Sequence, residues 1–158
     1  MLRQIIKSGQ IAINRRARFD YRIEETVEAG LSLSGAEVKS VRFGLVSLSD
    51  SFVAARGENL VIKNMAVTRL ATANKITGFD ERRDRQLLLH KSQIKRLRGK
   101  LIEKGATIVP MKLYFNNRGI IKVLLGAGFG KSKIDKRETI KKREWQRDRA
   151  RVLSGKKS

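Results

Sequence analysis

Cysteine is missing from this chain altogether. Disulfide bonds, cysteine-ligated zinc sites and thiol catalysis are therefore excluded together. A chain without disulfides fits a reducing compartment, so we expect the protein in the cytoplasm.

Long apolar runs are also absent. No segment has the length of a transmembrane helix, and the apolar residues of 1–13 are interrupted by Arg3, Lys7 and Gln10, unlike those of a signal peptide. The Arg-rich, acid-poor start through Arg18 resembles an organellar transit peptide in composition. This alternative stays open beside the interpretation we favour, a short disordered basic arm.

Acidic residues are scarce beside basic ones. The 158 residues include 36 Lys and Arg against 15 Asp and Glu, for a net charge of +21. The excess is spread over both the first 130 residues and the last 28, which alone hold twelve basic and four acidic residues. Nucleic acid is the commonest polyanion that balances such a charge. A membrane surface is the rival partner, but the basic C-terminal segment lacks the continuous apolar face of an interfacial helix, so we expect no membrane contact.

The length is typical of one domain. We predict three parts: a basic N-terminal arm at 1–13, a folded RNA-binding domain at 14–130 and a basic tail at 131–158. The hydrophobic pattern predicts mainly antiparallel β-structure with short helices. Strands are expected at 18–33, 51–56, 60–67, 86–89, 106–115 and 120–125. A bulge is expected near Glu25 and an edge or bulge at Pro110. This profile is typical of an OB-like β-barrel, closed or partly open.

Two helices are expected in the folded domain. Ser34 offers an N-cap for a helix through Val41 that stops before Gly44. Ser92 is the expected N-cap of a second helix, whose apolar stripe covers the open end of the sheet and which ends before Gly105.

The tail has helical charge spacing, with Glu138 placed four residues before Lys142. Its few large apolar residues cannot line a core, so we interpret it as a segment that becomes helical on binding an anionic partner. The glycine-rich run 126–132 fails the Walker spacing and is interpreted as a flexible joint. Trp145 either stacks on an unpaired base or packs on Val152 and Leu153.

The acidic residues of the folded domain are concentrated in Glu24, Glu25, Glu28 and Glu37. Paired carboxylates would suit a metal-dependent nuclease. However, neighbours in a strand point to opposite faces, and no Asp-x-Asp or histidine set accompanies them. We therefore favour ion pairs with arginines, or recognition of a cytosine amino group or ribose hydroxyl.

Two basic features remain. The single histidine, His90, has no motif that supplies a catalytic partner, so we interpret it as structural or as an RNA-stacking contact. The segment 68–85 is expected to be a mobile loop whose Arg82, Arg83 and Arg85 contact phosphate.

Several short motifs, in this order, resemble those of the SsrA-binding proteins, also called small protein B. They are Asn14-Arg15-Arg16-Ala17-Arg18, Ile23-Glu24-Glu25, Glu28-Ala29-Gly30, Glu37-Val38-Lys39-Ser40, Arg42, Gly44, Leu87-Leu88-Leu89-His90, Lys112-Leu113-Tyr114-Phe115, Asp135-Lys136-Arg137 and Lys142-Arg143-Glu144-Trp145-Gln146. The resemblance covers roughly residues 13 to 153, and it rests on the shared order of the motifs.

The resemblance implies a monomeric, non-enzymatic adaptor without cofactor or metal. Its partners would be the tRNA-like part of transfer-messenger RNA, and the decoding centre and mRNA channel of the small ribosomal subunit. The implied RNA-binding residues are Asn14, Arg15, Arg16, Arg18, Glu28, Lys39, Arg42, Leu88, His90 and Lys122. The implied ribosome-binding residues of the tail are Lys131, Lys133, Asp135, Lys136, Arg137, Lys141, Lys142, Arg143 and Trp145. A general OB-type protein for RNA or single-stranded DNA, or a ribosomal protein with a basic extension, is the alternative.

The chain departs from the family pattern at four places. Phe19 stands where the family usually has histidine. Phe129, Ser132 and Ile134 replace two lysines and an aromatic residue before Asp135. The stacking contact expected just before Asp135 is therefore in question, unless Phe129 compensates for it.

Overall fold

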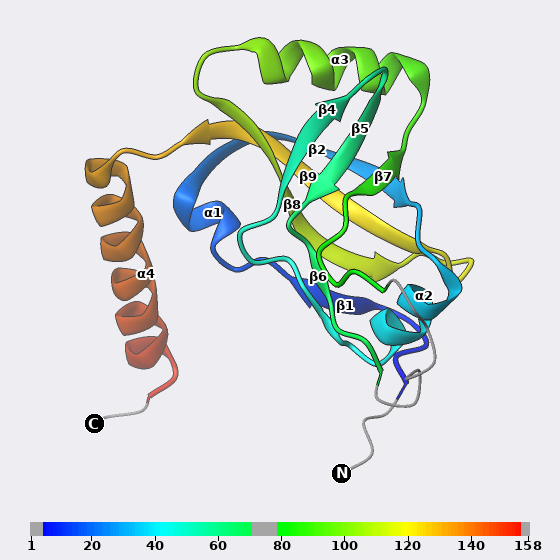
Figure 1. The fold of residues 1–158 in the computed structure, drawn as a ribbon. Helices are drawn as coiled ribbons and strands as arrows, with labels where there is room; N and C mark the ends of the chain where they lie inside the picture. Colours follow the sequence, from blue (N-terminus) through cyan, green and yellow to red (C-terminus); the bar gives the residue numbers. More distant parts are fainter. Residues whose placement is uncertain (1–4, 71–78, 156–158) are drawn as a thin grey trace.

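A seven-stranded antiparallel sheet forms the body of the protein in the computed structural model, which describes residues 5–70 and 79–155 (Figure 1). Its spatial order is β1-β8-β9-β2-β7-β5-β4. These strands are β1 (Gln10–Ile13), β2 (Tyr21–Leu31), β4 (Phe52–Arg56), β5 (Asn59–Lys63), β7 (Arg85–Leu88), β8 (Ala106–Phe115) and β9 (Ile121–Gly130). A separate two-stranded ribbon joins β3 (Val46–Ser47) and β6 (Ala66–Val67). The helices are α1 (Ala17–Asp20), α2 (Gly35–Arg42), α3 (Lys91–Ile102) and α4 (Lys133–Leu153).

The mainly antiparallel β-structure with short helices is confirmed. Within the described residues the hydrogen-bonded ladder ends at β1 on one side and at β4 on the other. The strands therefore form an open, curled sheet and not a hydrogen-bonded closed barrel. No helix of the described ranges has the length and apolarity needed to cross a bilayer.

Both predicted bulges are present in the long central strands. The register of β2 on β9 shifts between Ile23 and Glu25, and that of β8 on β9 shifts between Pro110 and Lys112. A proline has no N–H for the ladder, so an irregularity at Pro110 is the expected accommodation. Such bulges bend the strands and help the sheet to curl.

The core lies on the concave side of the sheet and under α3. Alternate residues of the strands are buried there, including Leu60 and Ile62 of β5, Leu113 of β8 and Leu125 of β9. Leu97 of α3 is fully buried against them, so the apolar stripe of this helix covers the sheet as predicted.

The N-cap predicted for α3 is wrong by two residues. The helix begins at Lys91, and His90 is the capping residue, with its backbone N–H donating to the Gln93 side chain over 3.1 Å. Ser92 therefore lies inside the first turn. The chain emerges from the helix through Gly105, at φ +78°, a left-handed conformation that glycine adopts without strain.

The expected start of α2 is confirmed. Ser34 accepts from the Glu37 N–H over 3.2 Å, and the Glu37 side chain accepts from the Ser34 N–H over 3.0 Å. This reciprocal pair is a capping box. Gly44 follows the helix at φ +73°, which explains why the helix stops before it.

Of the arginines that end the segment 68–85, one is buried and two reach the surface. Arg85 is completely buried and donates to Glu37, and Arg83 donates to the same carboxylate. Arg82 donates to the side chain of Asn64 over 2.7 Å. The interpretation of Arg85 as a phosphate contact is therefore wrong, because its guanidinium is fully buried on a partner of opposite charge. The Arg83 side chain is 40% exposed, so its contact with phosphate stays a prediction. Residues 71–78 of the expected loop lie outside the described residues.

The N-terminal arm contributes more structure than predicted. Residues 10–13 form β1 and pair with β8, and the Ile6 N–H donates to the Arg42 carbonyl over 2.6 Å. Ile11 and Ala12 pack on the core, so burial of these side chains offsets the cost of ordering the arm. The expectation of a disordered arm is wrong for these residues, and residues 1–4 lie outside the described ranges.

The strand expected from residue 18 begins later. Ala17 to Asp20 form the helical turn α1, closed by the Asp20 N–H on the Arg16 carbonyl at 2.8 Å and by an Arg16–Asp20 ion pair at 3.4 Å. An ion pair at this i,i+4 spacing supports helical geometry over extended geometry.

The glycine-rich run is strand, not a flexible joint. β9 continues through Gly130 and pairs with β2 up to Tyr21. A Cβ atom on Gly128 would lie 1.9 Å from the Arg22 carbonyl oxygen, so glycine is required there for the two strands to approach.

The tail forms the helix α4, which stands clear of the sheet and beside α1 (Figure 1). Ser132 is its N-cap and shares a capping box with Asp135, whose N–H donates to the Ser132 hydroxyl over 3.2 Å. The predicted helical character is confirmed. That the tail orders on binding stays a prediction.

Candidate nucleic-acid interface

One transverse row of residues crosses four strands of the sheet. Tyr114 of β8 pairs with Lys122 of β9, Lys122 pairs with Gly30 of β2, and Gly30 pairs with Leu88 of β7. These residues come from four segments of the chain, and only the register of the ladder brings them together. Their neighbour on β2, Glu28, is two residues from Gly30 and so lies on the same face.

A hollow of about 660 Å³ opens over this row. It brings together four of the residues implied by the family resemblance: Glu28, Leu88, His90 and Lys122. Its other lining residues are Thr26, Val27, Gly30, Leu89, Gln93 and Arg96. Residues of β2, β7 and β9 line it together with the first half of α3.

Leu88 is the apolar centre of the hollow, and 54% of its surface is exposed. An exposed leucine on a strand, placed between charged side chains, offers a surface on which a base or ribose can pack. A Cβ on Gly30 would lie 3.1 Å from the Leu88 Cβ, so the glycine gives Leu88 its room. Lys122 and Arg96 add the positive charge that phosphate requires.

Glu28 is held by Tyr114. The Tyr114 hydroxyl donates to Oε2 of Glu28, and the Lys112 ammonium lies 5.2 Å from the centre of the same ring. Burial, together with the hydrogen bond to Glu28 and the charge of Glu28, raises the pKa of Tyr114 to about 12. Tyr114 therefore remains a donor at neutral pH, and Glu28 presents a fixed carboxylate that can accept from an amino group or a 2′-hydroxyl.

Tyr114 was not among the site residues expected from the sequence. It lies in the motif Lys112-Leu113-Tyr114-Phe115, but a tyrosine in a strand is ordinarily a packing residue. Its role follows from the register of β8 on β9, which cannot be inferred from the sequence alone.

The expected basic residues near the start of the chain lie elsewhere. Arg15, Arg16 and Arg18 are exposed at α1, whereas Asn14 is fixed by donating from Nδ2 to the carbonyls of Pro110, at 3.0 Å, and Leu48, at 3.4 Å. Asn14 thus ties the end of β1 to β8.

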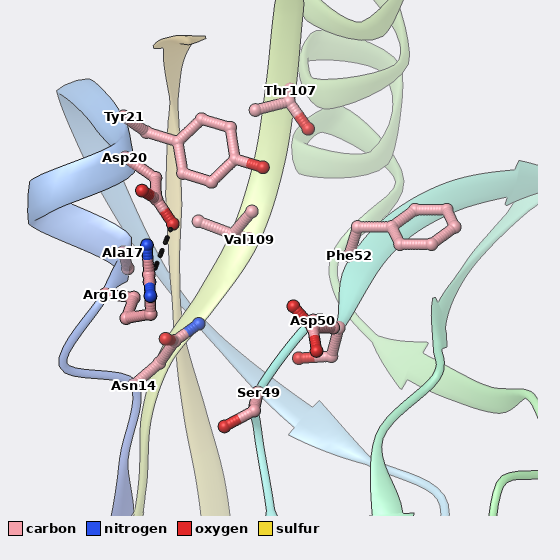
Figure 2. A pocket seen from close by; sticks show the side chains of 11 residues that line it. Asn14, Arg16, Ala17, Asp20, Tyr21, Ser49, Asp50, Phe52, Thr107 and Val109 are labelled. Atoms are coloured by element: carbon pink, nitrogen blue, oxygen red, sulfur yellow. Dashed lines mark hydrogen bonds and ion pairs between the residues drawn. The ribbon is translucent and has the colours of Figure 1, made fainter. Parts of the chain in front are cut away.

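A second hollow, of about 740 Å³, lies beside α1 (Figure 2). Asn14, Arg16, Asp20, Asp50 and Phe52 are among the residues that line it. Figure 2 shows the Arg16 side chain turned to Asp20, with which it forms an ion pair. Two aspartates on its walls make this hollow less suited to phosphate than the one over β2.

Lys39 and Arg42 occupy the last two turns of α2, and both are exposed. Figure 1 places α2 at the opposite end of the sheet from α3. The expected RNA-binding residues are therefore distributed over three places, the hollow with Leu88, the surface of α1 and the end of α2.

The tail residues lie along α4. The Lys131 ammonium donates to the Thr139 hydroxyl over 2.8 Å, and Asp135 belongs to the N-terminal capping box. Trp145 is 62% exposed, and the Arg149 guanidinium lies 5.3 Å from its ring centre. The other expected positions on the helix are Lys133, Lys136, Arg137, Lys141, Lys142 and Arg143.

The positions that depart from the family pattern have distinct surroundings. Cationic side chains from α1 and α4 lie over the Phe19 ring. The Phe129 ring lies 5.1 Å from the Lys100 ammonium of α3, so it belongs to the contact of α3 with the sheet. Ser132 caps α4, and Ile134 is 68% exposed.

The acidic residues have different partners: Glu25 and Glu37 form the expected ion pairs with arginines, Glu24 pairs with a lysine, and Glu28 accepts from Tyr114. Glu24 lies 3.0 Å from Lys100, and Glu25 lies 3.7 Å from Arg96. The hydrogen bond to Glu24 raises the pKa of Lys100. In the ranges 5–70 and 79–155, no three His, Cys, Asp or Glu side chains are grouped so as to hold a metal ion.

Comparisons with known proteins agree on one family. Residues 11–155 match the model of the SmpB protein family. The chain is 46% identical over 148 residues to the SsrA-binding protein of Caulobacter vibrioides, which covers 94% of this chain and 97% of that protein. It is 47% identical over 143 residues to the SsrA-binding protein of Rhodopseudomonas palustris, covering 90% of each. A solved chain described as "tmRNA-SmpB: a journey to the center of the bacterial ribosome" matches with a TM-score of 0.63 and 44% identity, over 82% of this chain and 93% of that one.

Proposed function

This chain belongs to the SmpB family, and on that basis we propose that it is the RNA-binding adaptor of trans-translation. It binds the tRNA-like part of transfer-messenger RNA through the curled sheet and delivers it to stalled ribosomes, which it engages through α4. It is not an enzyme. In this proposal the open sheet serves as an OB-like RNA-binding surface. The proposed location of the protein is the cytoplasm, where stalled ribosomes are found.

The observation that carries this proposal is the hollow over β2. In this hollow the exposed Leu88 side chain is flanked by the fixed carboxylate of Glu28 and the ammonium group of Lys122. An apolar surface flanked by an acceptor and a cation can pack on an unstacked nucleotide, accept from its hydroxyl or amino group and bind its phosphate. A surface that binds only phosphate would need no fixed carboxylate acceptor such as Glu28.

The test is competition binding. A fluorescent tRNA-like RNA is displaced from the protein by unlabelled copies of itself and by an unstructured strand of equal length. We expect clear preference for the folded RNA, and a log affinity that falls with log salt by about 0.7 to 0.9 per phosphate neutralised. Equal affinity for both competitors would favour a general single-strand binding protein.

Leu88→Ser probes the hollow itself. It removes the apolar centre at an exposed position, so the fold is retained while the preference for the tRNA-like RNA falls. Ile120→Ser is the matched control, because Ile120 is also exposed, at 50%, but lies in the turn outside the hollow.

The tail is tested by truncation after Gly130. The shortened protein should still bind transfer-messenger RNA but should no longer support tagging of stalled products. Tagging by the truncated protein would contradict the proposed role of α4.

A further inference from the structure

A groove of about 600 Å³ runs along the outer side of α3, between this helix and the turn that joins β4 to β5. Figure 1 shows this turn reaching α3. The Arg98 guanidinium donates to the Gly57 carbonyl of the turn, so the two walls are tied to one another. We call it the α3 groove, and the lining residues that matter below are Glu58, Lys91, Lys95, Arg98, Gly99 and Ile102.

The α3 groove and the hollow over β2 lie on different sides of α3. Arg96 lines the hollow, whereas Arg98 lines the groove, and two residues at this spacing project about 160° apart around a helix. Gln93 of the hollow and Ile102 of the groove are nine residues apart and project about 180° from one another. A nucleotide seated in the hollow therefore leaves the groove free.

The surface of the groove is partly aliphatic. Ile102 is 85% exposed, although it belongs to the helix whose Leu97 is fully buried. Ile94 also lines the groove, and residues 94, 98 and 102 form one row along the helix because they are four residues apart. Such a row fits the side chains of a second helix. No aromatic ring lines the groove to stack on a base.

Gly99 opens the middle of the groove. It lies inside α3, where glycine is destabilising relative to alanine. No atom lies within 4 Å of the Cβ that an alanine would add, so packing within this chain does not require glycine here. The missing side chain leaves space between Lys95 and Ile102, which are its surface neighbours at helical spacing. The backbone of a ligand can therefore approach α3 closely at this point.

The charge of the groove is not balanced by the chain itself. Three cations line it against one carboxylate, that of Glu58. The carboxylates that pair with α3 contact Arg96 and Lys100. In the ranges 5–70 and 79–155, none lies within ion-pair distance of Lys91 or Lys95, which are both exposed. A cationic groove with an aliphatic surface is complementary to a segment that combines acidic with apolar residues.

We propose that the α3 groove docks a second protein, which supplies a short helix with apolar residues on one face and acidic residues beside them. The apolar residues pack on Ile102 and over Gly99, and the acidic residues pair with Lys91 and Lys95. The proposal goes beyond the proposed function, because it adds a protein partner that binds while RNA occupies the hollow. A second copy of this chain is a poor occupant, since two chains of net charge +21 repel one another.

The first experiment identifies the sequences that the groove selects. A phage library of random peptides of about 16 residues, each about 24 Å long as a helix, is selected on the full-length protein. Excess tRNA-like RNA is present to occupy the hollow over β2. Binders are then depleted on the double variant Lys95→Glu, Ile102→Ser. We expect the surviving peptides to combine Asp or Glu with apolar residues at helical spacing. No survivor, or survivors without acidic residues, would overturn the proposal.

A surviving peptide, synthesised with a fluorescent label, then measures the contribution of each part of the groove by anisotropy. Ile102→Ser should weaken its binding roughly tenfold, as expected when one buried aliphatic contact is lost. Lys95→Glu should also weaken binding, and more strongly at low salt than at high salt. Arg118→Glu is the matched control, because it makes the same charge change at an exposed position in the β8–β9 turn. Equal losses in Lys95→Glu and Arg118→Glu would show that the peptide responds to net charge alone, which overturns the proposal.

Gly99→Gln tests the open middle of the groove. Glutamine favours the helix more than glycine does, so the melting temperature should rise while the added side chain blocks the peptide. A raised melting temperature with unchanged peptide binding would contradict the close approach at Gly99 on which the proposal depends. Circular dichroism shows that each variant keeps the fold.

Two other occupants are tested with the same variants. We expect Lys95→Glu and Ile102→Ser to change the affinity for the tRNA-like RNA by no more than about twofold, the effect of an exposed charge. If they weaken RNA binding as much as peptide binding, the groove belongs to the RNA-binding surface and the proposal is overturned. The protein should sediment as a monomer, and a dimer that Ile102→Ser dissociates would assign the groove to a second copy instead.

Discussion

Arg85 and Glu37 form an ion pair in the interior of the protein, with both side chains at most 2% exposed. Arg85 lies on β7 and Glu37 on α2, so the pair fastens the helix to the sheet across 48 residues of sequence. Arg83 shares the carboxylate, and Arg85 also donates to the carbonyls of Met65, at 2.6 Å, and Glu81, at 3.1 Å. Each nitrogen of the buried guanidinium therefore has an acceptor.

Removal of Glu37 should therefore be severe. Glu37→Ala leaves the Arg85 charge buried without its partner, and breaking one side of a buried pair costs about 3–5 kcal/mol in the free energy of unfolding. Urea unfolding followed by circular dichroism measures the loss. Glu58→Ala, at an exposed position in the β4–β5 turn, is the control and should change stability by less than about 0.5 kcal/mol. Equal effects of the two variants would contradict the role of the pair.

The Glu37 carboxylate also makes the free energy of unfolding depend on pH in the acidic range. Burial opposes the ionised form of Glu37, but the hydrogen bond from Ser34 and those from Arg83 and Arg85 outweigh it and lower its pKa from the ordinary value of 4.5. A lowered folded pKa contributes stability that is fully present above the unfolded pKa and is lost as pH falls through the folded one. The stability difference between the parent and Glu37→Gln should thus be constant near neutral pH and shrink below pH 4.5. If the stability difference between the two proteins does not change as the pH falls, the loss in Glu37→Gln comes from packing and not from the charge.

Tyr114→Phe should weaken RNA binding without unfolding the protein. It deletes the hydroxyl that orients Glu28 and keeps the ring under Lys112. A hydrogen bond worth about 0.5–1.5 kcal/mol net corresponds to a roughly 2- to 12-fold loss of affinity, measured by fluorescence anisotropy with the tRNA-like RNA. Tyr21→Phe, at the start of β2, is the control. In absorbance titration one tyrosine should ionise near pH 12 in the parent, and this transition should disappear in Tyr114→Phe.

Gly128→Ala should destabilise the junction between β2 and β9. The added methyl group would overlap the Arg22 carbonyl, at 1.9 Å, and forcing such overlap costs at least about 1–3 kcal/mol. Gly130→Ala is a close control, because no atom lies within 4 Å of the methyl group it would add. Thermal unfolding of the two variants should separate them clearly, and similar melting temperatures would argue against the close approach.

Features encoded locally were predictable from the sequence. The bulge near Glu25, the irregularity at Pro110 and the Ser34 cap each depend on residues next to one another in the chain. The buried position of Arg85 was not predictable, because arginine is ordinarily exposed and its partner Glu37 is distant in sequence. The glycine-rich run was misread for a similar reason, since the strand that requires glycine at Gly128 is β2.

The candidate site also combines residues that could be predicted with contacts between distant segments that could not. Glu28, Leu88 and Lys122 were expected from the family resemblance, and nothing in their own spacing placed them together. Their proximity comes from strand register, in which a shift of one residue would turn each side chain to the other face. The role of Tyr114 depends on its contact with Glu28, 86 residues away in the sequence, and could not be predicted from its own neighbours.

Because β9 is followed almost directly by the 21-residue helix α4, a rotation at their junction moves the whole helix. At 1.5 Å per residue it is about 31 Å long, so a tilt of about 10° at Ser132 moves its far end by about 5 Å, close to one helical turn. A small change of angle at the junction of β9 and α4 would thus displace the far end of the helix by about one helical turn.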